Sequence, residues 1–144
     1  MRLWHTELLP YLPAQQFRGQ LRELVAVMHT WRDEGTPNHM LVDYITDYDK
    51  SHLLKYFKIY AKLYEERYGK PMPAKWHSEF EEFCGTDIVH GPCFPNHHNL
   101  MYLKICMANL LEKHIPASKN RVTDEEWETL IKGYETSTGV EYCL

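Results

Sequence analysis

The chain has 144 residues, of which 44% are hydrophobic and 13% aromatic, and this composition predicts one folded domain spanning residues 1–144 with a core of its own. Its formal net charge is −4, which excludes a surface that attracts polyanions over the whole molecule, so any basic patch has to be local. No apolar run approaches the ~20 residues of a membrane span and the first residues lack the pattern of a signal segment, so we expect no membrane contact and a cytoplasmic location.

The first predicted helix follows a short extended arm. Pro10 and Pro13 bracket a turn, and Pro13 is suited to open a helix because its missing N–H is not needed in the first turn. Apolar residues then recur at helical spacing, namely Phe17, Leu21, Leu24, Val25 and Met28. The opposite side gathers small and polar residues, namely Gln15, Gly19, Arg22 and Glu23. Gly19 on this polar side allows either a ligand backbone or another helix to come close.

The sequence pattern in the middle of the chain predicts a long helix between two shorter segments. Gly35 ends the first helix, and a short helical or irregular stretch runs through Tyr44. Asp49 or Ser51 can cap the long helix, which Gly69 ends. One side of this helix carries an apolar stripe that is more typical of a buried core than of a stacking surface, namely Leu53, Phe57, Tyr60, Ala61 and Tyr64. A short helix is expected around three further aromatic residues, Trp76, Phe80 and Phe83.

Two helices are predicted in the last third, after a loop at residues 84–95 that holds two glycines and two prolines. The first has apolar residues at helical spacing, namely Leu100, Leu103, Met107, Leu110 and Leu111, and Pro116 closes it. Thr123 and Glu126 form a capping box at the start of the second, whose apolar face is Trp127, Leu130, Ile131 and Tyr134. No credible period-2 strand is present, so the predicted fold class is a compact all-α domain with irregular connecting loops.

Histidines and cysteines gather in and after that loop, at Cys84, His90, Cys93, His97 and His98. Thiolates and imidazoles are ligands of zinc, but structural zinc sites usually carry a tight pair of cysteines or of histidines, and here only the spacing from Cys93 to His97 is similar. We therefore expect no metal, and we expect reduced thiols because none of the four cysteines has Cys-x-x-Cys spacing. His90, His97 and His98 are instead candidate substrate contacts, since imidazole can donate to a phosphate.

The opening residues, Met1-Arg2-Leu3-Trp4-His5, place a terminal amine before the helix that carries Arg22 and Glu23. An α-amine has an unperturbed pKa of ~7.7–8.0, so an appreciable fraction is neutral and nucleophilic at physiological pH. A carboxylate beside such an amine can transfer protons, and an arginine can bind a phosphate through two hydrogen bonds. Together these groups indicate imine chemistry on a phosphodiester polymer.

This opening and the string Arg22-Glu23-Leu24 resemble the pyrimidine-dimer DNA glycosylase family, and the first five residues resemble a bacterial branch of it. The resemblance implies that a terminal amine attacks the sugar C1′ of a damaged nucleotide, that Glu23 assists, and that abasic-site lyase activity follows. It implies damaged double-stranded DNA as the partner and requires no metal or organic cofactor. We expect a monomer.

Two alignments to the family place different residues at the nucleophile. Matching Arg2-Leu3-x-x-Thr6 to the family, with one residue inserted before the helix, puts Met1 there, and the initiator methionine is then retained because Arg2 is too bulky for the usual processing. An ungapped match backwards from Glu23 puts Arg2 there, which moves the amine one residue, or ~3.8 Å of chain, further out. The catalytic candidates are Met1 and Glu23 under the first alignment.

The candidate DNA contacts are mainly basic and comprise Arg2, His5, Gln15, Arg18, Arg22, Lys119 and Arg121. His5 and Trp4 can equally serve as an anchor that orders the arm, because a free terminus normally frays. Two alternatives to a DNA glycosylase remain open. The acidic net charge and Arg2 favour a noncatalytic binding module on the same fold, and the histidine and cysteine loop allows a metal-dependent enzyme.

Overall fold

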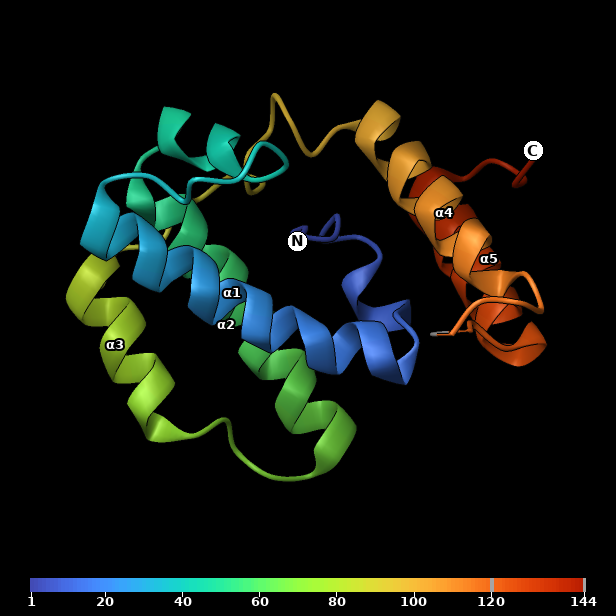
Figure 1. The fold of residues 1–144 in the computed structure, drawn as a ribbon, viewed down its shortest axis with the longest axis horizontal. Helices are drawn as coiled ribbons and strands as arrows, with labels where there is room; N and C mark the ends of the chain where they lie inside the picture. Colours follow the sequence, from blue (N-terminus) through green and yellow to red (C-terminus); the bar gives the residue numbers. More distant parts are fainter. Residues whose placement is uncertain (120, 144) are drawn as a thin grey trace. The chain divides into compact units, whose positions relative to one another are not determined.

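The computed structural model describes residues 1–119 and 121–143 and is built from helices (Figure 1). In chain order they are the 3-10 helix η1 (Leu9–Tyr11), α1 (Ala14–Glu34), the 3-10 helix η2 (Asp43–Asp47), α2 (Lys50–Tyr68), α3 (Ala74–Cys84), α4 (Leu100–His114) and α5 (Asp124–Thr138). Within those residues there is no strand, and the expected all-α fold class is confirmed.

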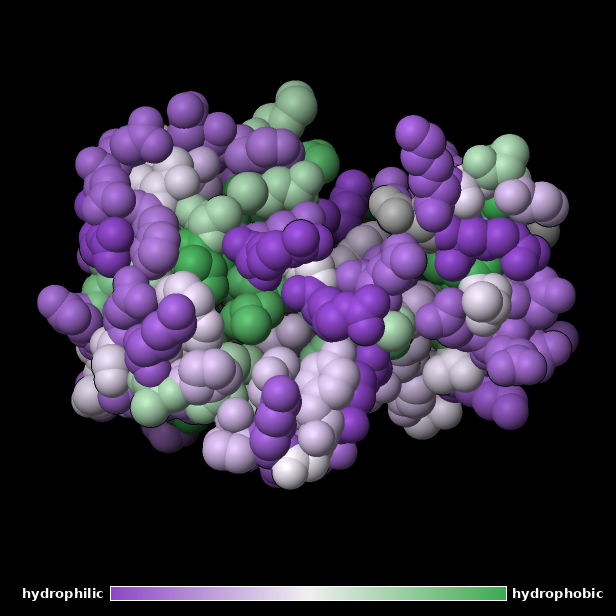
Figure 2. Space-filling model, turned by 60° about the horizontal axis from the view of Figure 1, so that its bottom comes forward, coloured by the Kyte–Doolittle hydropathy of each residue, from purple (hydrophilic) through white to green (hydrophobic). Residues whose placement is uncertain are grey.

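The chain divides into two compact units. The first contains Met1–Leu3 and Gln20–His97, and the second contains Trp4–Gly19 and His98–Leu144. Helix α1 begins in the second unit and continues into the first. None of the helices in residues 1–119 and 121–143 has the length and apolar character needed to cross a membrane. Hydrophilic side chains cover much of the face of each unit that Figure 2 shows.

Helix α1 follows Pro13, as the sequence predicts, and ends at Gly35, whose φ of +82° suits glycine. Most of its predicted apolar stripe is buried: Phe17, Leu24 and Met28 are completely inaccessible to solvent. Val27 is also fully buried, although the sequence pattern did not include it. Because the apolar side of α1 is buried, the rotation of the helix about its axis is set, and polar side chains on its opposite side face solvent.

Helix α2 provides the core of the first unit. Asp49 caps its start by accepting a hydrogen bond from the backbone N–H of Ser51, and Gly69 ends it with a φ of +68°. Leu53, Phe57, Tyr60 and Ala61 of the predicted stripe are buried, which confirms their expected core role, whereas Tyr64 is only half-buried. Tyr56, outside that stripe, is also fully buried. The ring of Phe57 stacks on Phe80 of α3 with centroids 4.1 Å apart, which packs these two helices together.

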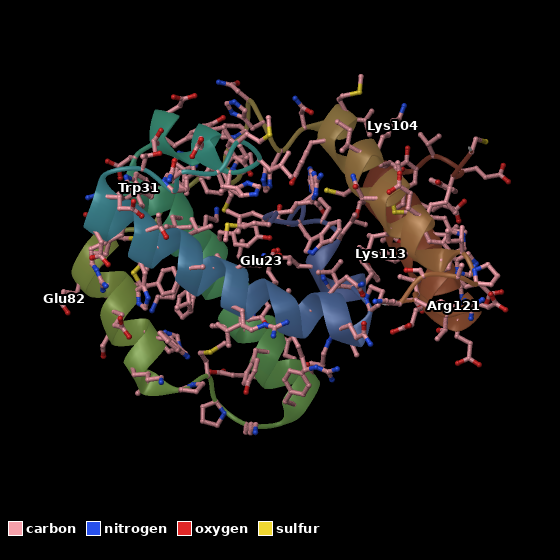
Figure 3. All side chains as sticks on the ribbon, viewed as in Figure 1. Glu23, Trp31, Glu82, Lys104, Lys113 and Arg121 are labelled. Carbon is pink, nitrogen blue, oxygen red and sulfur yellow. The ribbon has the colours of Figure 1, made fainter. Side chains whose placement is uncertain are left out.

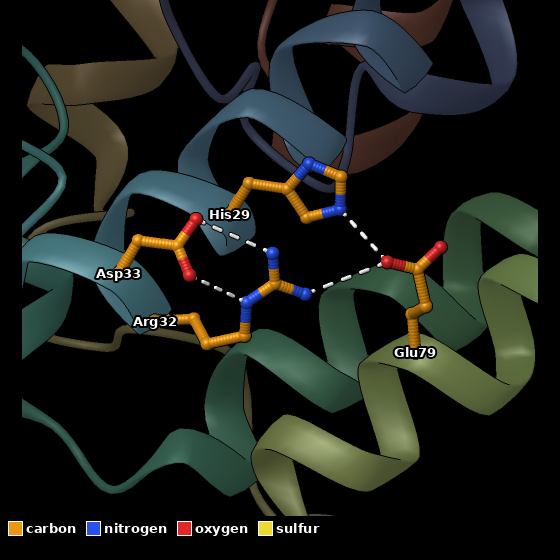
Figure 4. Close-up of polar contacts among 4 residues, drawn as sticks. All are labelled: His29, Arg32, Asp33 and Glu79. Atoms are coloured by element: carbon orange, nitrogen blue, oxygen red, sulfur yellow. Dashed lines mark hydrogen bonds and ion pairs between the residues drawn. The ribbon is translucent and has the colours of Figure 1, made fainter.

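A polar cluster joins α1 to α3 at the surface of the same unit (Figure 4). His29 Nε2 lies 2.9 Å from Glu79 Oε1, and an Arg32 nitrogen lies 3.5 Å from the same oxygen. The Arg32 guanidinium also donates two hydrogen bonds to the carboxylate of its neighbour Asp33. Because these side chains lie at the surface, solvent screens the pairs, and they contribute little to stability.

In the second unit, α5 packs against both α4 and η1. Asn99 caps α4, and Thr123 with Glu126 forms the predicted capping box of α5. The ring of Tyr11 lies against the backbone of α5 at Gly133, where a Cβ atom would meet it at 2.3 Å. Two predicted core residues of α4 differ: Leu100 is 54% exposed and borders a cavity at the first turn of the helix, and Leu111 is only half-buried.

Candidate functional site

The N-terminal arm is hydrogen-bonded to the predicted catalytic carboxylate. The backbone N–H of Arg2 donates to Glu23 Oε2 at 3.2 Å, and both residues lie in the first unit. Figure 3 labels Glu23 on α1. The Met1 amine and the Arg2 nitrogen are separated by three covalent bonds, or about 3–4 Å, so the amine lies within roughly 7 Å of Glu23 Oε2. Amine and carboxylate are therefore close enough to share one reacting sugar.

The sequence pattern of α1 explains how Glu23 is presented. Leu24 is fully buried, which fixes the rotation of the helix, and its neighbour Glu23 is then left half-buried beside the arm. Arg22 is exposed. Of these three consecutive residues, Arg22 presents its cation to solvent, Glu23 has a half-buried carboxylate, and Leu24 packs in the core.

Gln20 contacts both the arm and Glu23. Its Nε2 donates to the carbonyl oxygen of Arg2 at 2.9 Å and to Glu23 Oε2 at 3.3 Å. Its Oε1 accepts a hydrogen bond from the hydroxyl of Tyr56 at 2.9 Å. Gln20 and Tyr56 are both fully buried. The sequence pattern did not single out either residue, although Gln20 lies three positions before Glu23 and so shares its side of the helix.

The remaining candidate contacts on the arm and on α1 are solvent-facing. Arg2 is half-buried, and Gln15, Arg18 and Arg22 are exposed. Arg22 makes no ion pair with any residue in the described ranges, so its guanidinium is available to a ligand. A planar guanidinium that is not engaged by a carboxylate can bind a phosphate through two hydrogen bonds.

Two predicted contacts from distant parts of the sequence meet in the second unit. The rings of His5 and His98 stack with centroids 5.5 Å apart, and Tyr102 lies 4.7 Å from His98. His5 is only 7% exposed, and burial lowers its pKa, so this imidazole is held neutral. A cavity of about 370 Å³ borders both histidines and is also lined by Glu7, Lys104 and Tyr134. His5 is thus packed inside the second unit, and its contact with DNA and its role as an anchor both stay predictions.

The late basic residues lie in the loop before α5. Lys119 is exposed, and a guanidinium nitrogen of Arg121 lies 3.6 Å from Asp124. Their neighbour Asn120 lies outside the described residues. Figure 3 labels Arg121 beside α5. The charge of Arg121 is thus partly neutralised by the carboxylate of Asp124, the first residue of α5. Contact of Arg121 with DNA stays a prediction.

The histidines of the loop after α3 have different surroundings. His90 is exposed, whereas His97 Nδ1 lies 2.6 Å from the hydroxyl of Tyr48 and its ring stacks on Tyr44. His97 thereby connects the end of this loop to η2, which contains Tyr44 and is followed directly by Tyr48.

The nearby thiols are poor candidates for metal ligands. Burial raises the pKa of Cys84 to about 12 and that of Cys93 to about 11, and the thiolate is the form that binds metal. Among residues 1–119 and 121–143, no group of three or more His, Cys, Asp or Glu side chains is placed to hold a metal ion.

Comparison with known proteins identifies one family. A family model described as pyrimidine dimer DNA glycosylase matches residues 1–75. No curated protein and no solved structure matches the chain. The matched span contains the whole cluster formed by Arg2, Gln20, Glu23 and Tyr56.

Proposed function

The chain belongs to the pyrimidine dimer DNA glycosylase family, and from that premise we propose that it removes damaged pyrimidines through a Schiff base on its N-terminal amine and then nicks the abasic strand. The observation that supports this function is the hydrogen bond from the Arg2 backbone N–H to Glu23 Oε2, because it holds the start of the chain beside a carboxylate. Amine and carboxylate are the two groups that imine chemistry at C1′ needs.

The proposed reaction begins when the Glu23 carboxylate takes a proton from the Met1 ammonium, and the neutral amine then attacks the sugar C1′. The nitrogen–C1′ bond forms while the glycosidic bond breaks, and the base leaves with that electron pair and the proton held by Glu23. Glu23 next carries a proton from the attached nitrogen to the ring oxygen O4′, and the C1′–O4′ bond breaks as the nitrogen lone pair forms the Schiff base. Glu23, now a carboxylate, accepts a proton from C2′, and the C3′–oxygen bond breaks with the phosphate as leaving group. Water finally releases the amine. No metal or organic cofactor takes part.

The cations near the arm bind the phosphates in this mechanism. Exposed Arg22 supplies one planar donor group, and Arg2 supplies a second from the arm itself. Attack at C1′ requires that the nucleotide be distorted or extruded from the duplex, which costs less at a damaged pair. The proposed partner is therefore damaged double-stranded DNA bound by a single copy of the chain.

The nucleophile is proposed to be the amine of a retained Met1. With Met1 present the Arg2 nitrogen is an amide, which cannot form an imine, and its hydrogen bond instead fixes the backbone one residue from the amine. A chain that began at Arg2 would have its amine directly at the position 3.2 Å from Glu23 Oε2. The two chain starts thus predict different covalent adducts.

Borohydride trapping on a duplex with one cyclobutane pyrimidine dimer tests the function and the chain start together. We expect an intact mass that includes Met1 and a reduced adduct that maps to the Met1 nitrogen. The control is protein whose terminal amine has been acetylated, which is expected to give no adduct. An adduct on a lysine, or on a mature chain that starts at Arg2, contradicts the assignment of Met1.

A noncatalytic binding module is the second candidate function. The net charge of −4 and the large Arg2 side chain favour it, because they weaken DNA affinity and crowd the terminal amine. It predicts lesion binding without any trapped adduct and without strand nicking. The trapping experiment therefore separates the two functions when lesion binding is measured in parallel.

A further inference from the structure

Gln20 contacts the arm, the candidate catalytic carboxylate and the buried core at once. We propose that Gln20 is a positioning residue, which orients Glu23 so that Oε1 is the oxygen that exchanges protons with the substrate, and that the hydrogen bond from Tyr56 holds Gln20 in place. This inference rests on the proposed function, since it assigns a role within that reaction.

The hydrogen bonds of Gln20 define which way its amide points. The Tyr56 hydroxyl donates to Oε1 at 2.9 Å, and the other amide atom, Nε2, then donates to the carbonyl of Arg2 at 2.9 Å and to Glu23 at 3.3 Å. A flipped amide would present its oxygen to the oxygens of Arg2 and Glu23 and would lose both bonds. The oxygens of Arg2 and Glu23, which can only accept, therefore select this orientation of the amide, and the Tyr56 hydroxyl satisfies Oε1 on its other side.

Both hydrogen bonds to the Glu23 carboxylate fall on the same oxygen. Oε2 accepts from the Arg2 N–H at 3.2 Å and from Gln20 Nε2 at 3.3 Å. No hydrogen bond to Oε1 occurs within the described part of the chain. A carboxylate anchored through one oxygen has its other oxygen free to give a proton to the leaving base and to take one from C2′.

Burial makes this arrangement rigid. Gln20 and Tyr56 are fully inaccessible to solvent, so water cannot replace a missing hydrogen bond at either side chain. Each of the polar contacts is therefore maintained by the packing of α1 against α2. Because the position of a catalytic group is critical on the scale of about 1 Å, the loss of this support is expected to slow the reaction about 10- to 100-fold.

The test compares Gln20→Met with Gln16→Met. Methionine keeps the length of glutamine and removes its hydrogen bonds. Gln16 is a matched control because it is also a buried glutamine of α1, at 9% exposed, and has no contact with Glu23 among the described residues. We expect Gln20→Met to lower the single-turnover rate of base removal about 10- to 100-fold with little change in the dissociation constant for lesion DNA. Gln16→Met is expected to keep the parental rate.

A second variant and a second readout separate positioning from folding and from the reaction itself. Tyr56→Phe keeps the ring but not the hydroxyl, so it is expected to slow base removal less than Gln20→Met does. Hydrogen exchange of the Arg2 amide reports the arm without any DNA, and it is expected to become faster in Gln20→Met but not in Gln16→Met.

The outcomes are distinct. Equal rates of base removal for the parent and a folded Gln20→Met protein overturn the positioning role. Unchanged exchange of the Arg2 amide in Gln20→Met also overturns it, whatever the activity. If the parent protein removes no base, the proposed function fails, and the exchange measurement alone then decides whether Gln20 holds the arm.

Discussion

At the scale of single residues, the decisive feature is that a backbone N–H and a buried amide converge on one carboxylate oxygen. Neither Gln20 nor Tyr56 could be found from the sequence, because their contact joins residues 36 positions apart and depends on how α2 packs. Arg22 and Glu23 could be found, because they are adjacent and their side of the helix follows from the buried Leu24. The position of Arg22 and Glu23 on the helix could thus be predicted from local sequence, whereas the hydrogen bonds that hold the Glu23 carboxylate required the fold.

Glu23→Gln is expected to separate catalysis from binding. The amide oxygen of the new side chain can accept the hydrogen bonds of Arg2 and Gln20 that Oε2 accepts now, so the fold and most DNA affinity remain. Proton transfer is lost, which for a general acid–base group means a decrease of about 10²- to 10⁴-fold in rate. Single-turnover base removal measures the loss, with thermal unfolding as the control. Equal rates for mutant and parent would place Glu23 outside the chemistry.

At the scale of helices, the starts and ends of elements were the most predictable features. Asp49 and Thr123 cap α2 and α5 as expected, because a cap depends on residues within one turn of each other. The exposure of Leu100 was not predictable from helical spacing. It occupies the apolar stripe of α4, but its burial depends on whether another element lies over the first turn, and a cavity lies there instead.

Gly133→Ala tests the packing of η1 on α5. The added Cβ would lie 2.3 Å from the ring of Tyr11, so the ring or the helix has to shift, and overpacking of this kind costs about 1–3 kcal/mol of unfolding free energy. Gly91→Ala is the control, since nothing lies within 4 Å of its Cβ position. Denaturant unfolding measures both. Equal stability of the two variants would mean that Tyr11 does not pack closely on α5.

At the scale of the whole molecule, acid sensitivity follows from three histidines. Burial lowers the pKa of His5, His52 and His77 from 6.5. These three histidines therefore bind protons more readily in the unfolded chain, so their contribution to the free energy of unfolding is constant above about pH 7.5 and becomes destabilising as the pH falls through 6.5 towards the lowered values.

His77→Gln is expected to reduce this dependence on pH. Glutamine can still accept the hydrogen bond that Lys58 Nζ makes to His77 Nδ1 at 3.1 Å, but it does not titrate. Denaturant unfolding at about pH 7.5 and about pH 5 compares it with the parent and with His90→Gln, which changes an exposed residue. A pH dependence as steep as that of the parent would exclude His77 as a contributor.

The salt dependence of DNA binding tests how a chain of net charge −4 approaches a polyanion. If Arg22 contacts a phosphate, DNA affinity decreases with salt, and Arg22→Ala makes the slope of log affinity against log salt shallower by about 1. Arg32→Ala removes the same charge from the same helix. Arg32 is already bound by Asp33 and Glu79, so its substitution is expected to leave the slope unchanged.

Titrations of damaged and undamaged duplexes at several salt concentrations compare the two arginine variants. Arg22→Lys adds a further distinction, because lysine keeps the charge and loses the planar fork. It is expected to retain the parental slope while lowering affinity for the damaged duplex more than for the undamaged one. Equal slopes for Arg22→Ala and the parent would remove Arg22 from the phosphate contacts. Absence of binding to either duplex at low salt would exclude DNA as the partner, because attraction to phosphates is strongest there.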